Sequence, residues 1–192
     1  MARRLRFQEV DGIHHCTQHG IGDMPIYQDD RDRQRFLYYL ADEVVRSDWE
    51  CLAYTLMRTH YHLLVRLRKP SLSSGFQHLN GRYAQVFNVI HGRRGHLFEA
   101  RFRDQIVDSD AYRFEATRYI HLNATKAGLC HRPEDYPWCD YGSTVGLHSA
   151  DPIVDPTKAL DFLECDLHTA RRLYRRLVEE RDPRVRRGLT RV

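Results

Sequence analysis

The stretch CLAYTLMRTHYHLLVRL, residues 51–67, carries the clearest secondary-structure pattern in this chain. Most of its residues are apolar or aromatic and favour β structure. The pair Arg58-Thr59 interrupts the apolar pattern near its middle. The pattern therefore predicts two strands, at 49–57 and 60–67, which a short turn joins into an antiparallel pair.

His60 and His62 lie two positions apart on the second of these strands. Because side chains alternate along a strand, both imidazoles point to one side, with Cα atoms about 6.5–7 Å apart. Neutral imidazole is a common ligand of divalent metals, so the pair is a candidate half of a metal site. For two histidines alone, a half-exposed strand face without a metal is the more frequent explanation.

A second segment, RYIHLN at residues 118–123, lies on a predicted helix. The run Asp108-Ser109-Asp110 supplies an N-cap and an acidic first turn for this helix, and Gly128 is a suitable stop. Tyr119 and Asn123 are four residues apart and so share a helix face. An amide oxygen of Asn123 could join the two histidines as a third ligand, which would place the phenol of Tyr119 near the ion. A packed core tyrosine is the alternative.

The order of the predicted elements is β-α-β-β-α-β, which is the ferredoxin-like arrangement. We therefore predict an α+β fold with an antiparallel sheet and helices on one face. An extra helix carries Tyr119. Residues 1–145 would form the main domain, and 146–192 a helical, arginine-rich C-terminal extension. The predicted strands are 8–18, 49–57, 60–67 and 97–107, and the predicted helices are 30–46, 71–91 and 109–123.

From about residue 5 to residue 145, the chain resembles the REP-associated tyrosine transposases. These are a branch of the single-tyrosine transposases within the HUH endonucleases, named for two histidines that flank a hydrophobic residue. The matching segments follow one another in the family's order. They are LM and HYHLLV within 56–65, LNGRYAQ at 79–85, GHLF and RF within 95–102, YIHLN and AGL within 119–129, and PEDYPW at 133–138.

The resemblance implies a role for each matching residue. Tyr119 would be the nucleophile, and His60 and His62, with Asn123, would hold Mg²⁺ or Mn²⁺. A tyrosine hydroxyl ordinarily ionises near pH 10, so it needs activation by a metal or a base. Attack on DNA would leave a 5′-phosphotyrosine link and a free 3′-hydroxyl. That link keeps the bond energy, so a second strand could be joined without ATP.

The chain departs from the family pattern at four places, none of which removes the nucleophile or a metal ligand. Lys126 retains a positive charge near the position of a family arginine. The departures are Arg58-Thr59 for Pro-Asn, Ala124-Thr125-Lys126 for Pro-Val-Arg, His19-Gly20 for Arg-Gly, and Ile21-Gly22 for Gly-Asn.

The charge distribution favours a nucleic-acid partner. The net charge of the 192 residues is only +4, whereas residues 171–192 alone carry +6. Arginines bind phosphates, and neighbouring aromatic residues stack on unpaired bases. For the C-terminal residues, a solvated helix face is the alternative. The candidate DNA-binding residues are Arg82, Arg93, Arg94, Arg101, Arg103, Lys126, Arg171, Arg172 and Arg175.

The residues predict a metal-dependent endonuclease that cuts single-stranded DNA, and the resemblance implies that it is also a strand-transferase acting on DNA hairpins from palindromic repeats. One alternative is a catalytically inactive, domesticated hairpin-binding protein, and a weaker one is a hydrolase that uses water. We expect a cytoplasmic, nucleoid-associated monomer or homodimer, because the sequence has neither a signal peptide nor a membrane-spanning run. The five scattered cysteines predict free thiols.

Overall fold

The structure, a computed structural model, describes residues 8–181, so the arginines of the predicted basic tail beyond residue 181 lie outside it. A four-stranded antiparallel sheet with the strand order β2-β3-β1-β4 forms its centre. This order and the two helices between the strands confirm the predicted ferredoxin-like α+β fold. The elements of this unit are β1 (Ile13–His19), α1 (Asp30–Ser47), β2 (Trp49–Leu56), β3 (His60–Leu67), α2 (Leu72–Ile90) and β4 (Arg103–Val107).

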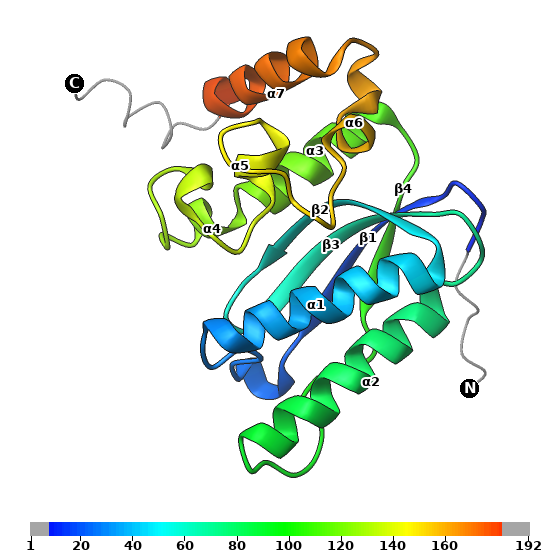
Figure 1. Ribbon diagram of the computed structural model, residues 1–192, viewed down its shortest axis with the longest axis vertical. Coiled ribbons are helices and arrows are strands. Elements are labelled where there is room, and N and C mark those ends of the chain that lie inside the picture. Colours follow the sequence, from blue (N-terminus) through cyan, green and yellow to red (C-terminus); the bar gives the residue numbers. More distant parts are fainter. Residues whose placement is uncertain (1–7, 182–192) are drawn as a thin grey trace.

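The helices that follow β4 lie on the other side of the sheet from α1 and α2 (Figure 1). The predicted helix at 109–123 is divided at Leu122 into α3 and α4. Within the predicted capping run Asp108-Ser109-Asp110, Ser109 is the cap of α3, since its side chain accepts a hydrogen bond from the backbone N–H of Tyr112. The remaining elements are η1 (Ile21–Asp23), α3 (Asp110–His121), α4 (Asn123–Lys126), η2 (Pro133–Asp135), α5 (Tyr141–Thr144), α6 (Pro156–Ala159), η3 (Asp161–Leu163) and α7 (Leu167–Arg181).

Alternation along β3 supplies a core on each face of the sheet. Tyr61 and Leu63 point toward α1 and α2, where they pack with Phe36 and other buried side chains. Leu64 points the other way and packs against Ala116 and Ile120 of α3. The sheet is therefore covered on both faces, and α3 is held firmly above the face that carries His60 and His62.

The fourth strand is shorter than predicted. The strand expected at 97–107 begins only at Arg103, and an isolated bridge between Gly20 and Phe98 is the pairing seen before it. Leu97 and Phe102 turn into the core instead, where the ring of Phe102 stacks on Phe76 with centroids 4.2 Å apart. Apolar residues that pack under a helix need not form β-sheet hydrogen bonds. The apolar pattern alone therefore predicted a strand that is too long at its N-terminal end.

The C-terminal segment, which is the part of the described chain after α4, packs along the outer edge of β2. The backbone N–H of Leu56 donates to the carbonyl of Trp138 at 2.9 Å, and Cys51 forms a parallel bridge with Val154. Buried residues on both sides of position 146, among them Tyr141 and Tyr174, share one cluster. The domain boundary at 145/146 stays a prediction. Among the described residues, no helix has the length and apolar character that crossing a bilayer requires.

Gly20 closes β1 beside the histidine face, and its backbone passes close to residues 24–26. A Cβ atom at this position would overlap the carbonyl oxygen of Met24 and lie 2.9 Å from Ile26 Cγ2. We expect Gly20→Ala to lower the free energy of unfolding by about 1–3 kcal/mol, measured by urea denaturation.

Gly81 provides the matched control, because it lies within α2 and a Cβ there would meet nothing within 4 Å. Gly81→Ala should raise stability by about 0.5–1 kcal/mol through the better helix propensity of alanine. Equal stability of Gly20→Ala and the wild type would show that β1 can move away from residues 24–26.

Candidate active site

Four imidazoles share the face of the sheet that α3 covers. In the antiparallel ladder between β1 and β3, His19 is opposite His60, and Thr17 is opposite His62. His15 lies two residues before Thr17, so it points to the same side. The sequence analysis identified His60 and His62 but assigned no site role to His15 or His19. Their signal was the period of two along β1, which becomes informative only once the partner strand is known.

His62 has a neighbour at each ring nitrogen. Its Nδ1 lies 3.0 Å from His15 Nε2 and 3.2 Å from Thr17 Oγ1, while its Nε2 lies 3.1 Å from the amide nitrogen of Asn123. A proton on Nδ1 finds an acceptor in either neighbour, which leaves the lone pair at Nε2. His15 and Thr17 thus hold the ring in the tautomer that a metal-binding Nε2 requires.

His15, His60 and His62 are neutral at physiological pH. Burial lowers the pKa of His15 and of His60 to about 4. For His62, burial lowers the pKa to about 2, and the nearby imidazoles of His15, His60 and His19 further disfavour a positive charge on it. Neutral imidazole is the form that binds metals, so the site does not need to lose protons before it can bind one.

Tyr119 lies over the same face. Its ring centroid is 5.4 Å from that of His62 and 5.9 Å from that of His15, and its side chain is 43% exposed. Asn123 begins α4, and its contact with His62 directs it toward the same site. Lys126 places its Nζ 4.9 Å from the centre of the Tyr119 ring. The structure thus brings Tyr119, His60, His62 and Asn123 together at one place.

An open cleft of about 500 Å³ runs along this face. Arg103, at the start of β4 and paired with Thr17, places its guanidinium-bearing side chain at the cleft, opposite α3. The cleft is wide and exposed, and its lining includes both a basic residue, Arg103, and an exposed tyrosine, Tyr119. Its lining includes His15, Thr17, His19, His62, Arg103 and Tyr119.

The other basic residues selected from the sequence are distributed over three regions. Arg82 lies on α2, across the sheet from Tyr119, where it pairs with Asp42 and covers the ring of Tyr39. Arg93, Arg94 and Arg101 lie between α2 and β4. The last three, Arg171, Arg172 and Arg175, line a second cleft of about 550 Å³ along α7. Arg103 and Lys126 are therefore the two members of this set that accompany Tyr119.

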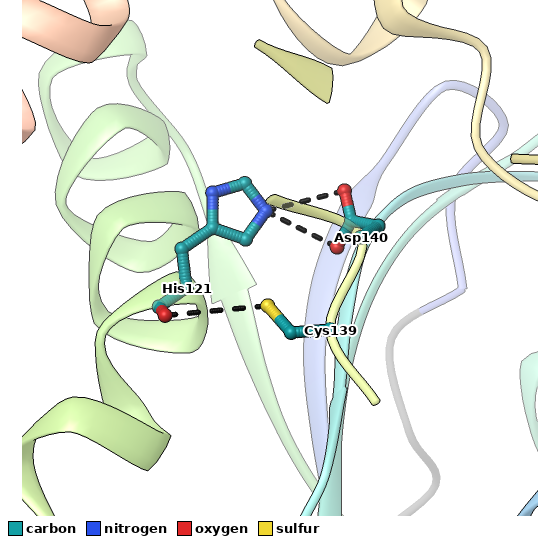
Figure 2. Close-up of side chains that lie close together, drawn as sticks. All are labelled: His121, Cys139 and Asp140. Atoms are coloured by element: carbon teal, nitrogen blue, oxygen red, sulfur yellow. Dashed lines mark hydrogen bonds and ion pairs between the residues drawn. The ribbon is translucent and has the colours of Figure 1, made fainter. Parts of the chain in front are cut away.

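A buried polar network ties α3 to the C-terminal segment. His121, two residues from both Tyr119 and Asn123, is fully buried, and its Nε2 lies 3.1 and 3.2 Å from the carboxylate oxygens of Asp140 (Figure 2). Its Nδ1 lies 2.8 Å from the hydroxyl of Tyr174 on α7. Burial raises the pKa of Tyr174 well above its ordinary value, so the hydroxyl stays protonated and donates to Nδ1.

The ligand atoms of His121, Cys139 and Asp140 lie within 4.8 Å of one another, a spacing that a metal could use. Their polar atoms already have protein partners. The carboxylate of Asp140 also accepts from the N–H of Tyr54 and from the hydroxyl of Thr144, both at 2.7 Å. Since each group is satisfied, the network is complete without a metal, and its effect is to fix the end of α3.

The comparisons with known proteins agree with this fold. No protein-family model matches the sequence, and no curated protein matches it. A solved structure of a REP-associated tyrosine transposase bound to a REP hairpin is similar to this chain, with a TM-score of 0.59 and 19% sequence identity. The similarity covers 82% of this chain and 94% of that chain. The resemblance expected from the sequence is therefore confirmed at the level of the fold.

The depressed pKa of His62 predicts how stability changes with pH in the presence of EDTA. Below pH 6.5 the unfolded chain binds a proton at this residue that the folded chain does not bind until about pH 2. The contribution of His62 to the free energy of unfolding is therefore fully present above pH 6.5. It decreases as the pH falls, by up to about 1.4 kcal/mol per pH unit. Urea denaturation between pH 7.5 and 5 measures the slope.

His62→Gln should give a shallower slope than the wild type in this experiment. His131→Gln, at an exposed position, should keep the wild-type slope. Identical slopes in all three proteins would show that His62 takes up its proton equally well in the folded state.

The buried network of His121, Asp140 and Tyr174 predicts that removal of a single hydroxyl lowers the free energy of unfolding. Tyr174→Phe leaves Nδ1 of His121 buried without its donor, so the free energy of unfolding should fall by about 1–3 kcal/mol. Tyr38→Phe, at a 66% exposed position on α1, should change it by less than about 0.5 kcal/mol. Equal values for the two variants would mean that the network does not contribute to stability.

Proposed function

We propose that this protein is a metal-dependent, single-stranded DNA endonuclease and strand-transferase. Tyr119 is its nucleophile, and its substrate is DNA folded into a hairpin. The observation that carries the proposal is the position of Tyr119, whose ring lies 5.4 Å from that of His62 in an open cleft. The similarity to a transposase structure bound to a REP hairpin supports the choice of substrate.

The donor set fits a divalent metal. His62 Nε2 and the Asn123 amide are 3.1 Å apart, close to the roughly 3 Å that separates two ligands at right angles around Mg²⁺ or Mn²⁺. Amide oxygen and nitrogen exchange by a half-turn of the side chain, so the oxygen can occupy the same place. His60 completes the set from the same strand. A bound divalent ion would polarise the scissile phosphoryl group.

The chain's own residues perform the transfer. The hydroxyl oxygen of Tyr119 attacks the phosphorus, the bond from phosphorus to the 3′-oxygen breaks, and that oxygen gains a proton. The tyrosine proton passes to solvent, because the side chain is 43% exposed. Lys126, whose Nζ lies 4.9 Å from the ring centre, would attract a DNA phosphate to the attacking oxygen by its charge. Attack by another 3′-hydroxyl on the 5′-phosphotyrosine reverses these steps and joins a new strand.

Two basic regions would hold the DNA. Arg103 lies at the cleft beside Tyr119 and would bind a phosphate near the cleaved bond. The second cleft, along α7, presents Arg171, Arg172, Arg175 and Arg176. A row of this kind binds a phosphate backbone without reading its sequence, so it suits the paired stem of a hairpin.

The experiment uses purified full-length protein, Mn²⁺ and a labelled hairpin with single-stranded flanks, resolved on a denaturing gel. The wild type should form a slowly migrating protein–DNA adduct, and Tyr119→Phe should form none, because it lacks the attacking oxygen. Tyr112→Phe, two turns earlier on α3, is the matched control and should retain the adduct.

The other outcomes identify the alternatives. Hairpin binding in a gel-shift assay, with neither adduct nor cleavage in the wild type, would replace the proposal with an inactive DNA-binding protein. Cleavage that persists in Tyr119→Phe without an adduct would indicate a hydrolase that uses water as its nucleophile.

A further inference from the structure

A groove lies on the face of the sheet that α1 and α2 cover, between α2 and residues 95–102. It begins as a hollow of about 470 Å³, whose lining includes the buried side chains of Gln18, Phe76 and Phe102. A neighbouring hollow of about 440 Å³ continues it along α2. Phe98, which is half-buried, lines both hollows. We call the two together the α2 groove.

Side-chain amides give the first hollow a polar lining that is held in place. The hydroxyl of Tyr61 donates to Asn80 Oδ1 at 2.7 Å, and Gln18 Nε2 donates to the carbonyl of Ala100 at 2.9 Å. Gln77 lines the same hollow with an exposed side chain. An amide presents a donor and an acceptor side by side, which is the pattern that the edge of an unpaired base requires.

Phe98 and Arg101 add the two other contacts that a nucleotide needs. Because Phe98 lines both hollows, a base that enters the groove can stack on its ring. Stacking of this kind accepts every base, since each has a π face. Of the described residues that line the first hollow, Arg101 is the one charged residue, so its field favours a phosphate there.

The α2 groove and the open cleft over the histidine face lie at the same edge of the sheet. Along β1, Thr17 and His19 line the cleft, whereas Gln18 between them lines the groove. The ladder between β1 and β4 ends with the pair of Thr17 and Arg103. Arg103 lines the cleft, and Arg101, only two residues earlier, lines the groove. One DNA strand that passes around this edge would therefore meet both arginines in succession.

We propose that the α2 groove binds an unpaired nucleobase of the same DNA strand that Tyr119 attacks, a few nucleotides from the cleaved bond. The inference rests on the proposed function, which supplies single-stranded DNA as the substrate. The base stacks on Phe98 and pairs with the amides of Gln77 and Asn80, while the adjacent phosphate binds Arg101. The strand thus crosses from one face of the sheet to the other, and the bound base sets which bond reaches the cleft.

The test measures the affinity of the full-length Tyr119→Phe protein for DNA, because this variant lacks the attacking oxygen and binds without forming an adduct. The probe is a labelled hairpin with unpaired oligo-dA flanks, in which one flank nucleotide at a time is made abasic. Adenine is chosen because its N6 and N7 edge suits an amide. One abasic position should weaken binding by about tenfold or more, since it removes the stacked base.

Two further substitutions in this background connect that position to the groove. Phe98→Leu should bind the intact probe about tenfold more weakly and should lose the abasic effect at that position. Gln77→Ala should reduce the effect, and its exposed position makes it safe for folding. Gln34→Ala, an exposed glutamine on α1, is the matched control and should keep the full effect.

Circular dichroism and urea midpoints show whether each variant is folded. The same abasic effect in the parent, in Gln77→Ala and in folded Phe98→Leu would overturn the proposal. A free nucleotide is the other source of a base. Calorimetric binding of dAMP that Gln77→Ala weakens, without any sensitive flank position, would also overturn the assignment to the DNA strand.

Failure of this inference is distinguishable from failure of the proposed function. A flank position that depends on Gln77 and Phe98, with no DNA adduct in the wild type, would refute the transferase and leave the base site intact. Adduct formation in the wild type, with abasic effects that no groove variant changes, would refute the base site alone. Absence of hairpin binding in the parent protein would refute both.

Discussion

The pairing of Thr17 with His62 in the antiparallel ladder sets the position of every polar group in the cleft. A shift of β3 by one residue would turn both histidines into the core under α1 and α2 and bring Tyr61 to the cleft. Tyr61 opposes such a shift, because it is fully buried and its hydroxyl donates to Asn80 of α2 at 2.7 Å. The geometry of the histidine face is thus maintained by hydrophobic packing on the opposite face.

A second constraint acts on the helix above the sheet. His121 lies between Tyr119 and Asn123 in sequence but points away from the cleft, into the network with Asp140 and Tyr174. The helix end is therefore held from both sides: by the contact of Asn123 with His62 and by the buried bonds of His121. Tyr174 belongs to α7. This helix therefore helps to fix the position of Tyr119, although it lies on the side of α3 away from the cleft.

Periodicity and helix spacing predicted the order of the elements along the chain and the N-terminal cap of α3, because these are local properties. The resemblance to the transposases led us to expect Tyr119 near His60 and His62. The sequence did not predict the places of His15 and His19, since these depend on the register with a strand more than forty residues away. It also grouped Arg82 with the DNA-binding residues, whereas the fold places that side chain across the sheet. The network of His121 joins residues far apart in the chain, and no local pattern indicates such a contact.

The hydrogen bonds along the outer side of β2 have a consequence for assembly. An exposed strand edge is where a sheet can be extended by another chain. Here Trp138, Asp140 and Val154 already engage the backbone of β2. A strand from outside would have to displace the protein's own C-terminal segment there, whereas β4 forms the opposite edge of the sheet. Within residues 8–181, a strand added to the sheet would therefore pair at β4, the edge that carries Arg103 next to the cleft.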